Sequence, residues 1–144
     1  MSDYKNILVA LDLSNDADVV LQKAVTISSQ FNAVLTVIHV VEPVVLDVNM
    51  EFAPSFNVDI ETSLVERAEQ FLKGTLERLS MKNCTSKVLV GSVKHEIHRE
   101  AEENQIDLII MGTHGRHGVA RLLGSTANAV LHGAPCDILT VKIK

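Results

Sequence analysis

The sequence has few of the residues that mark several specialised classes of protein. It contains no tryptophan and one tyrosine, so side chains on which the bases of single-stranded nucleic acid could stack are scarce. The net charge of -5 also argues against a general nucleic-acid binder. The two cysteines, Cys84 and Cys136, stand far apart in the sequence and have no CxxC spacing. This usage predicts a cytoplasmic protein whose thiols are reduced.

Long hydrophobic runs are absent as well. The first residues show no basic region followed by a long apolar run, so no signal peptide is expected. No apolar stretch reaches the roughly 18 residues of a membrane span, which argues against membrane insertion. With 47% hydrophobic and 22% charged residues, the whole chain, residues 1–144, is expected to form one globular domain with an ordinary core.

Short apolar runs alternate with amphipathic segments along the chain. Strands are predicted at 6–11, 34–41, 85–90, 106–111 and 137–143, and helices at 17–31, 60–79, 93–104 and 125–132. This order predicts an α/β fold, a five-stranded parallel, doubly wound sheet with helices on both faces. Residues 42–59 are predicted as a long loop, whose apolar side chains either form a lid or anchor the loop on the core; these are Met50, Phe52 and Phe56.

Residues 111–127 combine glycines and basic side chains between a predicted strand and a predicted helix. Backbone N–H groups and a helix dipole at such a junction can hold an anion, so the segment indicates a phosphate and with it a nucleotide. Parallel sheets bind ligands beyond the carboxyl ends of their strands. If the first and fourth strands are neighbours, Asp12 and Gly112 face one crevice. Nothing matches GxGxxG after the first strand or a P-loop anywhere, so neither of those nucleotide folds is supported.

Several segments, in this order, resemble the universal stress protein family. They are Tyr4-Lys-Asn-Ile-Leu-Val-Ala-Leu-Asp12, His39-Val-Val-Glu42, Asp107-Leu-Ile-Ile-Met-Gly-Thr-His-Gly-Arg-His-Gly118, Gly124-Ser125 and Cys136-Asp-Ile-Leu-Thr-Val-Lys142. The resemblance covers nearly the whole chain and implies the α/β fold of that family and a role in stress response. It also implies a sheet order in which Cys84 and Cys136 stand at opposite edges, too far apart for a disulfide.

The glycines resemble the family motif G-x2-G-x9-G-[ST], which marks members that bind ATP or another adenine nucleotide. Gly112 and Gly115 match the first two glycines, and Gly124 with Ser125 matches the end of the motif. Only eight residues separate Gly115 from Gly124, so the loop is one residue shorter than the motif requires. The chain is more similar to this nucleotide-binding branch than to the branch that lacks the glycines.

The resemblance implies a role for each matched position, with ATP or AMP as the ligand and Mg²⁺ as a candidate companion ion. Ala10 would line the base, and Asp12 and the backbone of Val40 would contact adenine or ribose. The remaining positions would contact the ribose and the phosphates or add positive charge at the rim; they are Met111, Gly112, Gly115, Arg116, Gly124, Ser125 and Thr126. No protein residue is expected to ligate a metal.

The same residues also have plainer interpretations. The glycines could only turn the chain after the strand, and Asp12 could only cap the helix that follows it. Ser125 is expected to cap its helix under either interpretation, and His39 is expected to be a structural histidine. His95 and His98 have the spacing of metal ligands, but no third ligand is evident, so they are expected on a solvated face.

Three functions are therefore weighed. The first is a homodimeric stress protein that binds ATP or AMP and acts through conformation or partner contact; the family pairs its last strand, here 138–143, with the twofold mate. The second is a homodimeric interaction module that binds no nucleotide. The third is a slow nucleotide hydrolase, although no carboxylate pair near 112–126 indicates dedicated catalysis.

Overall fold

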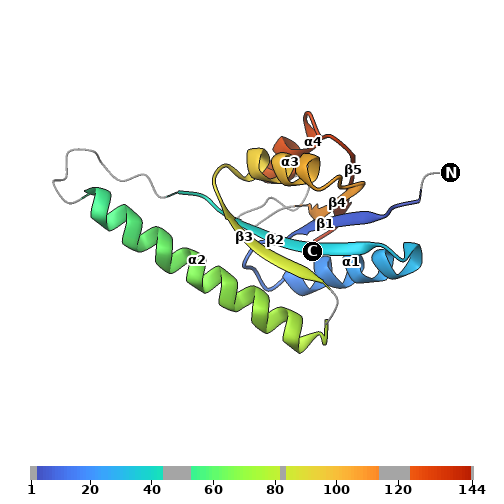
Figure 1. Ribbon diagram of the computed structural model, residues 1–144, viewed down its shortest axis with the longest axis horizontal. Helices are drawn as coiled ribbons and strands as arrows, with labels where there is room; N and C mark the ends of the chain where they lie inside the picture. Colours follow the sequence, from blue (N-terminus) through green and yellow to red (C-terminus); the bar gives the residue numbers. More distant parts are fainter. Residues whose placement is uncertain (1–2, 44–52, 82–83, 114–123, 144) are drawn as a thin grey trace.

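The computed structural model describes residues 3–43, 53–81, 84–113 and 124–143. Strands and helices alternate in it (Figure 1): β1 (Asn6–Ala10), α1 (Ala17–Phe31), β2 (Val34–Val41), α2 (Ala53–Arg78), β3 (Thr85–Val90), α3 (Val93–Glu103), β4 (Leu108–Gly112), α4 (Ser125–Leu131) and β5 (Asp137–Val141). The five strands pair in parallel in the order β3-β2-β1-β4-β5. The predicted α/β fold with a parallel sheet is confirmed.

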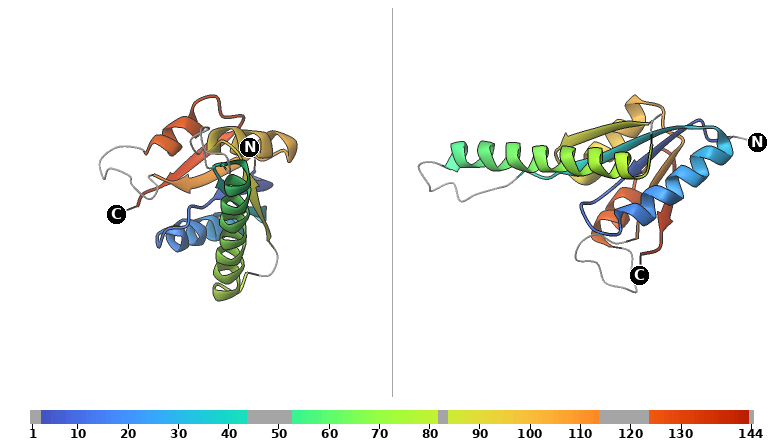
Figure 2. Two further views of the ribbon diagram at one scale, coloured as in Figure 1. Left: turned by 90° about the vertical axis from the view of Figure 1, so that its left-hand side faces the viewer. Right: turned by 90° about the horizontal axis from the view of Figure 1, so that it is seen from below.

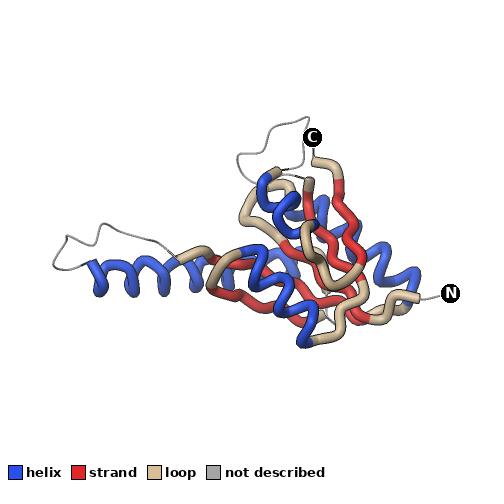
Figure 3. The backbone as a smooth tube through the Cα atoms, turned by 90° about the horizontal axis from the view of Figure 1, so that it is seen from above, coloured by secondary structure: helices blue, strands red, loops and turns tan. Residues whose placement is uncertain are grey.

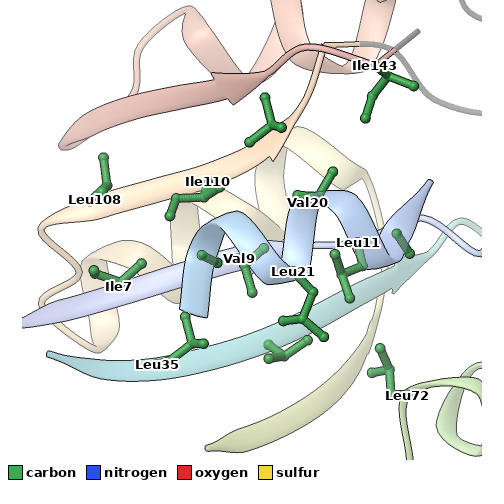
Figure 4. Packing of buried hydrophobic residues seen from close by; sticks show 14 residues of the cluster. Ile7, Val9, Leu11, Val20, Leu21, Leu35, Leu72, Leu108, Ile110 and Ile143 are labelled. Carbon is green, nitrogen blue, oxygen red and sulfur yellow. The ribbon is translucent and has the colours of Figure 1, made fainter. Parts of the chain in front are cut away.

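Helices cover both faces of this sheet. Figures 1 and 3 show α3 and α4 on one face, and the view from below in Figure 2 shows α1 and α2 over the other. Side chains alternate along each strand, so one strand supplies both cores. In β1, Ile7 and Val9 pack toward α1 and α2 (Figure 4), whereas Leu8 packs toward α3 and α4. Burial on both faces explains why the strands are continuous apolar runs.

Helix α2 is longer than the sequence predicted. The predicted loop at 42–59 was wrong for its second part, because the helix begins at Ala53 instead of at residue 60. Pro54 lies in the first turn, where a missing N–H removes no helical hydrogen bond. Phe56 therefore has helical backbone, while Met50 and Phe52 lie outside the described residues. The beginning of the helix extends well beyond the sheet (Figure 1).

The two edges of the sheet carry different side chains. On the β3 edge, the Lys87 ammonium lies 2.5 Å from a carboxylate oxygen of Glu100, which α3 holds in a buried position. Cys84 stands just before β3 and Cys136 just before β5, both as free thiols, so they flank opposite edges as expected. Burial raises the pKa of both thiols, and an exposed, activated cysteine is not present among the described residues.

None of the helices in the described ranges is long and apolar enough to cross a membrane.

The turn between β3 and α3 depends on Gly91. Its φ of +151° lies where side chains are strained, and a Cβ there would come 2.6 Å from Oε1 of the buried Glu96. We predict that Gly91→Ala lowers the free energy of unfolding by about 1–3 kcal/mol. Gly74→Ala is the matched control, because a Cβ on this glycine of α2 meets nothing within 4 Å.

Urea denaturation monitored by circular dichroism measures both variants. Gly74→Ala should raise stability by about 0.5–1 kcal/mol, since alanine is the better helix former. An unfolding midpoint of Gly91→Ala at or above that of the parent would contradict the prediction.

Candidate functional site

A cavity opens where the carboxyl ends of β1, β2 and β4 meet the beginnings of α1, α3 and α4. It comprises about 710 Å³ of atom-free space, including its opening to solvent. The sheet order explains its position: β1 takes β2 as its neighbour on one side and β4 on the other, so the chain turns away in both directions at this point. Such a switch point is where doubly wound sheets bind ligands.

Most of the predicted site residues reach this cavity. Those that line it are Ala10, Asp12, Val40, Met111, Gly112 and Thr126. Gly124 and Ser125 immediately precede Thr126 at the beginning of α4 but do not line the cavity themselves. Gly115 and Arg116 lie outside the described residues. Because β1 pairs with β4, the structure brings together two parts of the sequence that are about a hundred residues apart.

The carboxylate of Asp12 organises the turn between β1 and α1. Its Oδ1 accepts hydrogen bonds from the backbone N–H of Ser14 at 3.1 Å and from the Ser14 hydroxyl at 2.5 Å. The Ser14 oxygen in turn accepts the N–H of Asp16 at 3.2 Å, and Asp16 is the N-cap of α1. Asp12 therefore does not cap the helix itself. Among the described residues nothing donates to its Oδ2, so this oxygen can accept a hydrogen bond from a ligand.

The beginning of α4 differs from the expectation in one respect. The N-cap is Gly124, with φ -62° and ψ 159°, and Ser125 is the first helical residue. The expectation that Ser125 caps the helix was wrong; glycine is also an acceptable N-cap residue, so the sequence alone did not distinguish the two. The amide of Gly124 donates to the carbonyl of Thr113 at 2.6 Å, which ties the beginning of α4 to the end of β4.

His39 has a structural contact and also lies on the cavity wall. Its Nδ1 is 2.6 Å from the carbonyl oxygen of Leu11. Because a carbonyl oxygen only accepts hydrogen bonds, Nδ1 carries the proton and donates a hydrogen bond to this oxygen. In the neutral ring, Nε2 is then a hydrogen-bond acceptor. His98 is likewise engaged, 2.7 Å from the carbonyl of Val130 in α4. Within the described residues, no three histidine, cysteine or acidic side chains are grouped so that they could hold a metal ion.

Sequence reasoning missed much of the apolar wall. Val93 and Ile97 come from α3, Ala127 from α4, and Ile143 from the segment after β5. The two α3 residues could have been predicted to line the site. A helix that follows a parallel strand begins at the carboxyl end of that strand, which is where the site lies. Ile143 had no such signal in the sequence.

Comparison with known proteins identifies the family. Residues 3–142 match the sequence profile of the universal stress protein family. Universal stress protein A homolog 1 of Coxiella burnetii is 40% identical over 141 residues, 98% of each chain. The structure of universal stress protein UspA from Lactobacillus plantarum, 26% identical, superposes with a TM-score of 0.85 over the whole of both chains. A universal stress protein solved in complex with cAMP is 23% identical, with a TM-score of 0.63 over 97% of this chain and 98% of that one. The chain belongs to the universal stress protein family.

Proposed function

We propose that this chain binds an adenine nucleotide, ATP or AMP, in the cavity at the carboxyl ends of β1, β2 and β4. The observation that carries the proposal is that residues matched to the nucleotide-binding pattern from two distant segments, Ala10 with Asp12 and Met111 with Gly112, line the same cavity. The protein would act in the cytoplasm, in stress response, through a conformation or a partner contact that depends on the bound nucleotide.

The chemistry of the cavity suits such a ligand. An apolar part, formed by Ala10, Val40 and Ile97, can enclose a flat base. The free oxygen of Asp12 can accept a hydrogen bond from a ribose hydroxyl. Gly112 and Thr126 mark the side of the cavity toward the glycine-rich segment, where the phosphates would lie. The relative solved with cAMP supports the choice of an adenine nucleotide, since a protein of this fold was crystallised with one.

The shortened spacing between Gly115 and Gly124 favours a second candidate. Eight residues separate these glycines instead of the nine of the nucleotide-binding motif, so the phosphate-holding backbone differs in length. The second candidate is a homodimeric interaction module that holds no nucleotide. Both candidates use the same fold, so only binding measurements distinguish them.

We predict that adenine nucleotide is released when the purified protein is heat-denatured, and that calorimetric titration with ATP, ADP, AMP and cAMP detects binding of at least one. The double variant Gly124→Val with Ser125→Ala should weaken that binding about tenfold, because the valine obstructs backbone approach and the serine hydroxyl is lost. Gly74→Ala, a glycine substitution on α2 away from the cavity, should bind as the parent does.

Absence of nucleotide both in the denatured extract and in every titration would favour the interaction module. Unchanged affinity in the double variant would move the phosphate site elsewhere. ATP turnover faster than about 1 s⁻¹ would instead support the hydrolase interpretation.

We also propose that two copies pair through β5. This strand pairs with β4 alone among the described strands, so its other side offers unpaired backbone groups. An edge of this kind is either covered or used for pairing. Antiparallel pairing of β5 with its mate around a twofold axis would satisfy these groups in both copies.

Removal of residues 138–144 tests the pairing. The parent protein should sediment at twice its chain mass of 15.7 kDa, and the truncated protein should give monomer or aggregate. Circular dichroism shows which truncated fraction keeps its helices, since Val141 also belongs to the core. A truncated chain that remained a stable dimer in sedimentation equilibrium would contradict pairing through β5.

A further inference from the structure

Thr113 is the residue at which three segments are fastened together. It follows β4 directly, and its backbone N–H donates to the carbonyl of Val141 at the end of β5, at 2.9 Å. Its own carbonyl accepts the N–H of Gly124, the N-cap of α4, at 2.6 Å. Its hydroxyl oxygen accepts the N–H of Ile143 at 3.1 Å. The first two contacts use backbone groups that any residue could supply, whereas the third needs an oxygen on the side chain.

The side-chain contact of Thr113 holds Ile143 beside the end of β4. Beyond Val141 the ladder between β4 and β5 has ended, so hydrogen bonds of the sheet no longer hold the backbone. The bond from Ile143 to the Thr113 hydroxyl holds the segment at that point, and Ile143 is 5% exposed. Figure 4 shows Ile143 beside the core residues on the α1 side of the sheet. Lys142, which stands between Val141 and Ile143, is exposed and is not part of this core.

Ile143 forms part of the cavity wall together with Gly112 and Thr126. A residue near the end of the chain thus completes a site whose other walls come from β1, β2, β4 and the helices. Its contribution depends on the segment being fastened, because an unfastened apolar side chain would leave that wall open to water. Thr113 also accepts the hydrogen bond from Gly124, the N-cap of α4, and Thr126 lies in the first turn of this helix.

We propose that Thr113 is a positioning residue for the ligand site, which fastens the C-terminal segment so that Ile143 closes the cavity, and that ligand binding and this fastening strengthen each other. The inference rests on the proposed function, since the ligand is the adenine nucleotide proposed above. Coupling between two such events is reciprocal by linkage: the ligand favours the fastened segment by the factor by which fastening favours the ligand. The nucleotide site and the end of β5 are thereby connected.

Isosteric substitution of Thr113 tests the proposal. Thr113→Val keeps the shape and both backbone contacts but removes the side-chain acceptor, whereas Thr113→Ser retains an acceptor. Titration with AMP and with ATP should show affinity about 3- to 10-fold weaker for Thr113→Val, the effect of one hydrogen bond, and within about twofold of the parent for Thr113→Ser. Ile143→Ala, which leaves Thr113 intact, should weaken binding by a similar factor, and Lys142→Ala should not.

Amide hydrogen exchange gives a second measurement. If Thr113 had only a structural role, nucleotide would not change the exchange rate of the Ile143 amide. Saturation with nucleotide should slow exchange at the Ile143 amide in the parent and in Thr113→Ser, and should leave it fast in Thr113→Val. Parent-like affinity in both Thr113→Val and Ile143→Ala would overturn this inference while the proposed function stands. A parent protein that binds no nucleotide would overturn both. If Thr113→Val does not fold, Ile143→Ala against Lys142→Ala decides the question alone.

Discussion

Strand β1 donates and accepts its ladder hydrogen bonds between β2 on one side and β4 on the other, and the rest of the molecule follows from that position. Because all five strands run in parallel, their carboxyl ends all lie at the same end of the sheet. The helices that follow β1 and β4 along the chain, α1 and α4, lie on opposite faces of the sheet, which leaves a space between the ends of these two strands. Asp12 and Gly112 border that space because Asp12 comes two residues after β1 and Gly112 is the last residue of β4.

The walls of the cavity differ in how firmly they are held. Asp12 is oriented by two hydrogen bonds with Ser14, and His39 by its bond with the Leu11 carbonyl, so the β1 and β2 side is fixed by local contacts. The opposite side depends on long-range contacts that meet at Thr113. A ligand that contacts both sides would therefore meet one wall formed in advance and another whose order it can reinforce.

Regular structure was predictable from periodicity, because strands buried on both faces and amphipathic helices leave strong patterns in the sequence. The juxtaposition of Asp12 and Gly112 followed from the rules for parallel sheets on the condition that the first and fourth strands are neighbours, and the structure shows that they are. The early start of α2 was not, because Pro54 suggests a loop although a first helical turn accepts proline. The place of Ile143 was not predictable either: it is set by a hydrogen bond to a residue 30 positions away, and no local pattern encodes such a contact.

The Lys87–Glu100 ion pair has a consequence for how many copies can join. Strand addition needs an edge that accepts a neighbour, and a lysine held against α3 on an edge strand disfavours that use of β3. Two copies joined through β5 would turn their β3 edges outward, so growth would stop at the pair. In such a pair, β5 would be the edge strand that associates and β3 the edge strand at which the sheet ends.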